Sequence, residues 1–252
     1  MARRPTTSDR STSRVPDRRE PPALTGREVF LDILTHELRT PVTTIYGGAQ
    51  LLATRDLSES RRRAVAADVR SEADRLYRLV EDLVILVRSE PGGLHPVGEP
   101  VALGHLVERA IEQTVARHPG ARVRLLGTHD AAADAADEVL VMHVLRNLLD
   151  NAVRYGASGQ PIEVIVNGAR NEVTARIVHH GGRPGLASED DPFALSGDAP
   201  ATDAGRAGAG IGLFVAERLV RAMGGRIWAM SSGADRVEFG FALRAGGRRA
   251  DA

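Results

Sequence analysis

The sequence contains no cysteine and no lysine, and only 4% of its 252 residues are aromatic. Without cysteine the chain forms no disulfide, no thiolate metal site and no cysteine nucleophile. Acidic and basic residues balance at 33 each, so no overall field attracts nucleic acid. Since every side chain counted as Lys or Arg is arginine, we interpret that bias as GC-rich codon usage and not as an RNA-binding surface.

Long apolar runs are also missing. No stretch approaches the roughly 20 residues that a membrane helix needs. The N-terminus is basic, but it lacks the apolar segment of a signal peptide. We therefore expect a soluble, cytoplasmic protein that does not insert into the membrane and binds no nucleic acid.

The first ordered region has a helical pattern. Residues 24–55 carry apolar side chains at spacings of three and four, and a second such helix follows over residues 59–89. Three apolar residues of the second helix recur every seven positions: Val69, Leu76 and Leu83. One helical hairpin cannot bury so wide a stripe, so we expect residues 24–90 to form a four-helix bundle as a homodimer.

The rest of the chain mixes helices with strands. We expect helices over 101–117, 137–155 and 211–223, and strands over 121–126, 162–166, 172–178, 225–230 and 236–243, with a turn at 167–168. The predicted fold class is therefore α + α/β, with an α/β sandwich after the hairpin.

Composition indicates how these parts are joined. Residues 1–23 and 246–252 have little to bury, so we predict disordered tails. Residues 91–100 read as a linker before an α/β domain over residues 101–245. Within that domain a polar, Gly- and Ala-rich stretch at 183–207 is too long for an ordinary connection, which predicts a functional lid.

The first helix contains the run from Phe30 to Pro41 that includes His-Glu-Leu-Arg-Thr-Pro. This run resembles the phosphoacceptor motif of bacterial two-component sensor histidine kinases. A neutral imidazole is a competent nucleophile, and the resemblance implies that His36 carries the phosphoryl group. It also implies that Glu37 holds the second ring nitrogen as N–H, and that Thr40 orients water for a phosphatase activity. Independently, Pro41 lacks a backbone N–H and should kink the helix just after His36.

A second constellation lies in the helix predicted over residues 137–155. Asn147 and Asn151 are one turn apart on an otherwise apolar helix, followed by Arg154 and Tyr155. This run resembles the N box of the Bergerat-type ATP-binding fold. The resemblance implies that Asn151 ligates Mg²⁺ through its amide oxygen, that Arg154 pairs with phosphate, and that Tyr155 packs on the base or ribose. Buried structural asparagines are the alternative reading.

The remaining nucleotide-binding calls rest on glycines and one phenylalanine. Gly208, Gly210 and Gly212 open a predicted helix just before Leu213, where backbone N–H groups bind phosphate. By resemblance, Phe193 is the lid phenylalanine.

One element departs from the family pattern. The family has an Asp that accepts a hydrogen bond from the adenine amino group, followed by Gly-x-Gly. Aligning the two patterns places His180 where that Asp belongs and Gly182 and Gly185 near the glycines. Neutral imidazole still accepts one hydrogen bond, but without charge assistance.

Together these motifs imply a kinase that transfers phosphate from Mg-ATP to His36 and then to an Asp of a response regulator. The alternative is a degenerate member that dimerises and docks a regulator with weak or absent ATP binding. The sequence does not identify the stimulus or the cognate regulator. It also does not indicate whether phosphate passes to His36 within one subunit or between the two subunits of a dimer.

Overall fold

The computed structural model describes seven ranges of the chain, which are residues 26–88, 99–127, 132–169, 171–181, 191–194, 209–232 and 235–245. Both predicted tails lie outside these ranges. So do residues 91–98 of the predicted linker and all of the predicted lid except residues 191–194.

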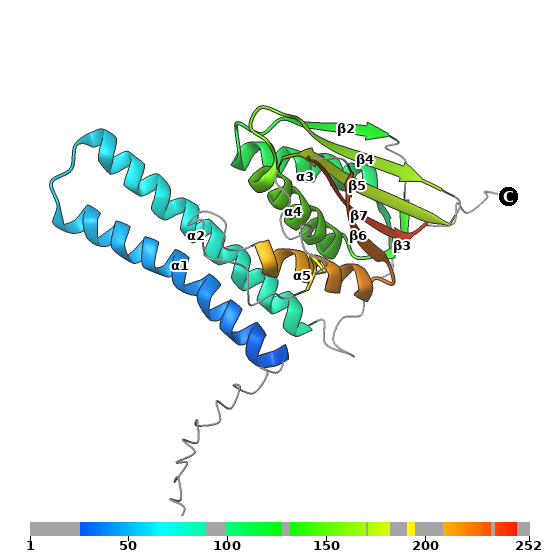
Figure 1. Cartoon of the computed structure of the whole chain (residues 1–252), viewed down its shortest axis with the longest axis horizontal. Helices are drawn as coiled ribbons and strands as arrows, with labels where there is room; N and C mark the ends of the chain where they lie inside the picture. The colour runs from blue at the N-terminus through cyan, green and yellow to red at the C-terminus, as the bar shows by residue number, and fades with distance from the viewer. Residues whose placement is uncertain are drawn as a thin grey trace, which may run out of the picture.

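Two long antiparallel helices form the N-terminal region (Figure 1). Helix α1 spans Gly26–Thr54 and α2 spans Glu59–Arg88. The Ser58 hydroxyl accepts a hydrogen bond from the Arg61 N–H at 3.4 Å and so caps the start of α2. Pro41 lies inside α1, and the helix continues through it without interruption.

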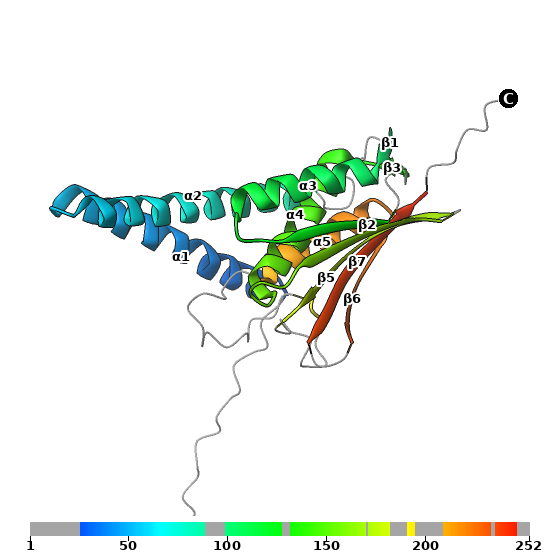
Figure 2. The same ribbon diagram turned by 90° about the horizontal axis from the view of Figure 1, so that it is seen from above.

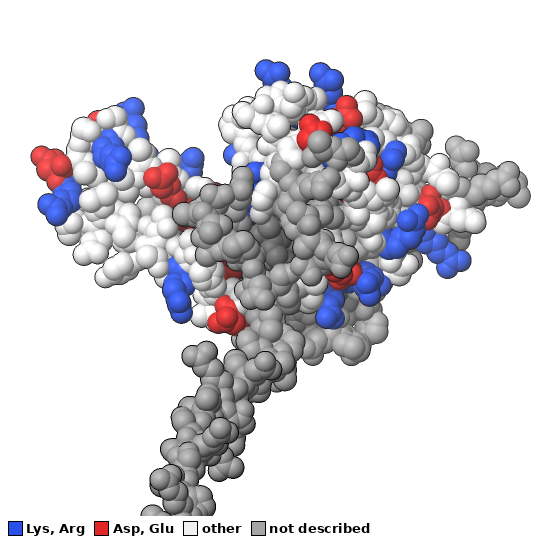
Figure 3. Space-filling model, in the orientation of Figure 1, with Lys and Arg blue, Asp and Glu red and all other residues white. Residues whose placement is uncertain are grey.

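The apolar rows of α2 divide between two faces. Val65 and Leu79 are buried, each 7% exposed, and Leu79 belongs to the core cluster of the α/β region. Val80 and Val87 are 47% and 74% exposed. The second row therefore stays on the surface of the hairpin. The hairpin carries both acidic and basic side chains on the face shown in Figure 3.

The second region is built on a five-stranded sheet in the order β2-β4-β5-β7-β6. Its strands are β2 (Val123–Gly127), β4 (Ile162–Gly168), β5 (Glu172–His180), β6 (Arg226–Ser232) and β7 (Arg236–Arg244). Strands β2 and β4 are parallel and the other pairs are antiparallel. A separate pair joins β1 (Glu99–Ala102) to β3 (Ala132–Ala136).

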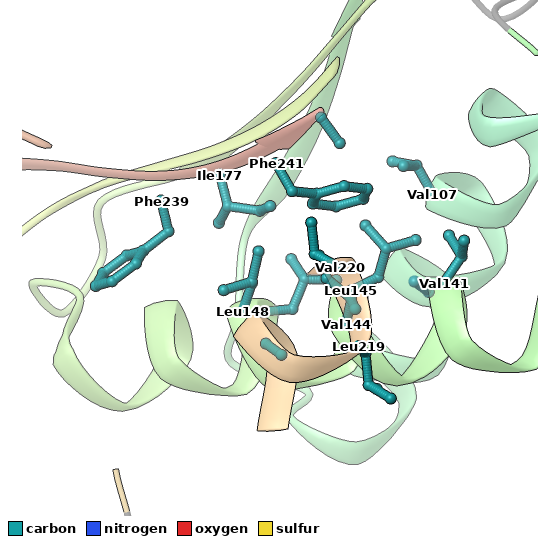
Figure 4. Packing of buried hydrophobic residues seen from close by; sticks show 14 of the residues in the cluster. Val107, Val141, Val144, Leu145, Leu148, Ile177, Leu219, Val220, Phe239 and Phe241 are labelled. Atoms are coloured by element: carbon teal, nitrogen blue, oxygen red, sulfur yellow. The ribbon is translucent and has the colours of Figure 1, made fainter. Parts of the chain in front are cut away.

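Three helices cover one face of the sheet (Figure 2), namely α3 (Leu103–Arg117), α4 (Glu138–Tyr155) and α5 (Ala209–Ala222). The core forms where the inward face of the sheet meets α4 and α5. Figure 4 shows Ile177 and Phe241 pointing from the sheet toward leucines of α4, and all of these side chains are fully buried. The predicted helical hairpin followed by an α/β sandwich is thus confirmed.

Two details of the predicted strands were wrong. Residues 99–102 form β1 instead of linker and helix, and β3 was not anticipated. The turn expected at Asn167–Gly168 also lies further along, because both residues belong to β4 and pair with Thr174 and Val173 of β5. Among the described helices, none is both long and apolar enough to cross a membrane.

The hairpin packs against the α/β region along α2 and α5, which lie side by side in Figure 1. Near the start of α1, the rings of Phe30 and Phe214 are 6.4 Å apart. Ile33, Leu34 and Leu38 of α1 pack against the same core cluster as the sheet. The segment around His36 therefore lies beside the α/β domain.

Candidate functional site

His36 lies on the exposed surface of α1. The hydroxyl of Thr40, one turn later, donates to the backbone carbonyl of His36 at 3.4 Å. In the same way Thr44 donates to the carbonyl of Thr40 at 3.2 Å. These local bonds run along the turn where Pro41 has no N–H to donate.

Glu37 is buried, with 6% exposure, and does not share the surface position of His36. Its carboxylate accepts a hydrogen bond from the Arg75 guanidinium of α2 at 2.8 Å. Arg75 also lies 3.5 Å from Glu72. A buried carboxylate is strongly stabilised by an ion pair with a cation. The guanidinium of Arg75 on α2 provides that cation for Glu37. In this arrangement the Glu37 carboxylate pairs with Arg75, whereas the prediction paired it with His36.

Helix α4 presents the predicted asparagines on a polar strip of an otherwise buried helix. It begins at Asp137, whose carboxylate accepts from the N–H groups of Val139 and Leu140 at 2.8 and 3.2 Å. Asn151 is 6% exposed, and neither of its amide atoms has a hydrogen-bond partner among the described residues. The Nδ2 of Asn147 is in the same condition. Buried unpaired amides of this kind point to a missing ligand.

A cavity of about 360 Å³ opens beside these asparagines, between α2, α4 and the start of α5. Its walls from the α/β domain include Asn147, Asn151, Arg154, Gly212 and Leu213. The wall from the hairpin includes Arg75, Arg78, Leu79 and Asp82. The structure therefore brings five of the predicted nucleotide-binding residues together, and it places them against the helix that pairs with Glu37.

Basic side chains surround one carboxylate of this cavity. Asp150 lies 3.1 Å from Arg117, and both Arg78 and His118 are 3.9 Å from it. Burial lowers the pKa of the Arg78 guanidinium and of the His118 imidazole, while the charge of Asp150 opposes both shifts. An excess of donors over carboxylates suits an anionic ligand such as a polyphosphate.

A clamp of charged side chains joins α4 to the hairpin. The Arg146 guanidinium lies 2.9 Å from Glu81 and 2.8 Å from Asp82, and Asp82 is only 4% exposed. His143 lies 3.7 Å from the same Asp82 carboxylate. The clamp fixes the asparagine-bearing helix against α2.

The two adjacent histidines of β5 lie on opposite faces of the sheet. Val173, Ala175, Ile177 and His179 alternate along the buried face of the strand. His179 therefore points toward the helices. His180 points to the opposite face, where its side chain is 44% exposed and its Nδ1 lies 3.8 Å from Asp235.

Close packing at the end of β5 reinforces this register. Gly156 and Gly181 form a β-bridge, and the Ala157 N–H donates to the carbonyl of His180. Gly181 has φ +136°, and a Cβ on it would lie 2.5 Å from the nitrogen of Ala157. The end of α4 is thus held directly over His179.

The other predicted site residues are partly described. Phe193 is buried and meets Phe239 of β7 edge-on at 6.2 Å. Gly210 lies in the first turn of α5, and Gly212 packs against Asn147. Tyr155 is half-buried at the end of α4. Gly182, Gly185 and Gly208 lie outside the described residues.

Several residues of the site were not predicted. Arg75 and Arg78 of α2, and the partners Glu81 and Asp82 of Arg146, are charged side chains of the hairpin that no motif singled out. One signal was available, because Glu72 interrupts an apolar row of α2, and Glu72 lies beside Arg75.

Comparisons with known proteins agree with this geometry. Residues 27–92 match the His Kinase A (phospho-acceptor) domain. Residues 136–246 match the histidine kinase-, DNA gyrase B- and HSP90-like ATPase family. The chain belongs to the two-component sensor histidine kinases.

Similar proteins include the sensor protein CutS of Streptomyces coelicolor, 31% identical over 220 residues that cover 82% of this chain and 50% of CutS. The kinase/phosphatase MprB of Mycolicibacterium smegmatis is 30% identical over 202 residues, 76% of this chain and 39% of MprB. The chain thus spans half or less of the length of these two curated relatives.

Solved structures share the fold. The histidine kinase AdeS of Acinetobacter baumannii superposes with a TM-score of 0.63 and 24% identity, covering 84% of this chain and 98% of that one. The histidine kinase ThkA, solved in complex with the response regulator protein TrrA, has a TM-score of 0.60 and 18% identity over 87% of this chain and 62% of that chain.

Proposed function

We propose that this sensor histidine kinase phosphorylates His36 from Mg-ATP and passes the phosphoryl group to an Asp of a response regulator. The observation that carries the proposal is the cavity between α2 and α4. The cavity is lined by Asn147 and Asn151, whose amide groups have unpaired atoms, and by Arg75. Arg75 forms an ion pair with Glu37, the residue next to His36.

In the transfer step, one ring nitrogen of neutral His36 attacks the γ-phosphorus with its lone pair. A nitrogen–phosphorus bond forms as the bond from that phosphorus to the β–γ bridging oxygen breaks, and this oxygen leaves on ADP with the electron pair. The other ring nitrogen of His36 keeps its proton. We propose that the Glu37 carboxylate leaves Arg75 and accepts a hydrogen bond from this N–H group.

The chain's residues fit a Mg-nucleotide. The unpaired amide oxygen of Asn151 is a hard ligand for Mg²⁺, which would neutralise phosphate charge. Arg154 in the cavity wall and the backbone at the start of α5 would bind phosphate oxygens. The aromatic ring of Tyr155, at the end of α4, is proposed to pack on the base or ribose.

The exposed row on the hairpin supports a homodimer. Val80, Val84 and Val87 of α2 and Val42 and Tyr46 of α1 are each at least 45% exposed. Burying them against a second hairpin would complete the predicted four-helix bundle. A response regulator is proposed as the second partner, and the ThkA complex with a response regulator supports that class of partner.

Incubation with γ-labelled ATP and Mg²⁺ tests the kinase proposal. We expect acid-labile label on the wild type and none on His36→Gln, while ATP binding stays unchanged. The matched control is His105→Gln, which removes an exposed histidine of α3 and should keep full labelling. Absence of label and of binding at millimolar ATP in the wild type would instead indicate a docking scaffold.

A further inference from the structure

One wall of the cavity comes from the hairpin and not from the α/β domain. Helix α2 contributes Arg75 and Arg78 to this wall, while α4 contributes Asn147 and Asn151. The side chains of the two arginines are only 16% and 28% exposed. A cation that is shielded from water depends on nearby anions, so the present partners of each arginine indicate what a ligand could offer it.

Arg78 has only a distant anionic partner among the described residues. Its Nε lies 3.9 Å from a carboxylate oxygen of Asp150, whereas Arg117 lies 3.1 Å from the same oxygen. Asp150 would therefore keep a cation if the Arg78 side chain turned away from it. Burial lowers the pKa of Arg78, which shows that its surroundings compensate its charge incompletely. A further anion in the cavity would supply that compensation.

Arg75 has a close partner, but the transfer step removes it. The guanidinium lies 2.8 Å from Glu37 and 3.5 Å from Glu72. In the proposed reaction Glu37 leaves Arg75 and accepts a hydrogen bond from the His36 ring. Arg75 then needs another anion in place of the nearer carboxylate, at the moment when the nucleotide is in the cavity.

The position of the phosphoacceptor indicates which part of the nucleotide lies at this wall. His36 belongs to the hairpin, and in-line transfer requires its ring nitrogen to come within roughly 3–3.5 Å of the γ-phosphorus. Asn151 of α4 and the start of α5 are proposed to hold the Mg-bound phosphates on the side of the α/β domain. The γ-phosphate therefore has to reach toward the wall that carries Arg75 and Arg78.

Resting on the proposed kinase function, we propose that Arg75 and Arg78 bind the terminal phosphate of the nucleotide, so that the hairpin completes the donor site. A guanidinium pairs with two phosphate oxygens at once, which suits this role. ADP lacks the γ-phosphate and leaves both arginines with their present carboxylates. Binding of ATP, unlike binding of ADP, thus draws Arg75 from Glu37 and makes that carboxylate available to His36.

Calorimetric titration of Mg-ATP and Mg-ADP tests the proposal. The full chain carries His36→Gln, so that no phosphate is transferred during the titration. Adding Arg78→Met should weaken Mg-ATP binding by about tenfold and leave Mg-ADP binding within about twofold. Arg78→Lys keeps the charge but not the two-point geometry, and it should recover part of the loss for Mg-ATP.

Arg75 requires a variant that keeps its ion pair, because Glu37 is buried. Arg75→Lys should weaken Mg-ATP binding by about threefold, with Mg-ADP unchanged. The matched control is Arg70→Met, which removes an exposed arginine of the same helix and should leave both dissociation constants within about twofold. Circular dichroism checks that each variant is folded.

The proposal and the kinase function fail in different ways. If folded Arg78→Met and Arg75→Lys bind Mg-ATP as tightly as the parent, or lose Mg-ATP and Mg-ADP equally, the hairpin does not bind the γ-phosphate. The kinase function still stands in that case, provided that the wild type labels His36. If the folded wild type binds neither nucleotide and takes no label, both fail together.

Discussion

The phosphoacceptor hairpin and the nucleotide-binding domain differ in how their functional polar groups are satisfied. In the hairpin, Glu37 already pairs with Arg75, and Thr40 bonds the backbone of His36. In the α/β domain, Asn151 and His179 are buried with polar atoms that lack partners among the described residues. The polar groups around the phosphoacceptor His36 are thus paired within the protein. The buried polar groups of the nucleotide-binding domain are arranged as in a site where a bound ligand supplies the hydrogen-bond partners.

This difference has an energetic consequence. Removing a paired group should cost stability, because its partner is left buried and charged. Removing an unpaired group should cost affinity for the ligand and little stability. The following substitutions separate these two outcomes.

The largest effect on labelling is expected for Asn151→Ala. Loss of the amide should weaken Mg-ATP binding by roughly ten- to hundredfold and bring His36 labelling below detection at low ATP. Because two unpaired buried atoms disappear, the free energy of unfolding without nucleotide should fall by less than about 1 kcal/mol. Calorimetry and denaturant unfolding measure the two quantities.

Asn171→Ala is the control for that change, since Asn171 is an exposed asparagine just before β5. It should alter neither quantity. A large loss of stability in Asn151→Ala would show that the amide is a structural group, contrary to the comparison.

Glu37→Gln should lower the rate of His36 labelling by about a hundredfold, because the carboxylate is proposed to hold the ring proton. Stability should fall by only about 1 kcal/mol, since the amide still accepts from Arg75 and Glu72 remains beside that arginine. Single-turnover labelling at saturating ATP gives the rate. Asp32→Asn changes an exposed carboxylate of α1 four residues before His36, and this variant should label normally.

Arg146→Met breaks the clamp between α4 and the hairpin. Asp82 would be left buried without its cation, so we expect the free energy of unfolding to fall by about 2–3 kcal/mol. Labelling should fall about fivefold as the asparagine helix loses its position against α2. Denaturant unfolding reports the first effect and small-angle scattering reports the looser arrangement.

Arg109→Met provides the contrast, because the Arg109–Glu138 pair at 2.6 Å is about half exposed. Such surface pairs contribute less than about 1 kcal/mol. Equal losses in the two variants would mean that the clamp is no more than a surface pair.

The two regions also differ in how far the sequence predicted them. The hairpin, its helix boundaries and the His36 motif follow from a period of three to four and from one contiguous run of residues. The α/β domain depends on strand register, where a shift of one residue exchanges the two faces. The predicted adenine contact at His180 rests on an alignment of motifs, which does not report that the side chain of His180 lies on the outer face of the sheet and that of His179 on the inner face.

The missed strands have a similar cause. Strand β1 contains Pro100 and has only four residues, and β3 consists of four Ala and one Asp, residue types that are uncommon in strands. Each exists because it pairs with the other, and such a long-range contact leaves no local pattern. The charged clamp and the Glu37–Arg75 pair escaped prediction for the same reason.

Thr40→Ala should have the smallest effect on labelling and the most selective one. Its hydroxyl donates to the carbonyl of His36, and at 3.4 Å that bond is long, so stability should change by no more than about 0.5 kcal/mol. Labelling of His36 should stay within about twofold, whereas dephosphorylation of the regulator should fall. The control is Thr35→Ala, whose hydroxyl makes a shorter bond of 2.7 Å to Leu31 and is not expected to affect dephosphorylation. Equal dephosphorylation rates in the two variants would mean that Thr40 serves the helix alone, which would make every polar group of the acceptor turn structural except His36 and Glu37.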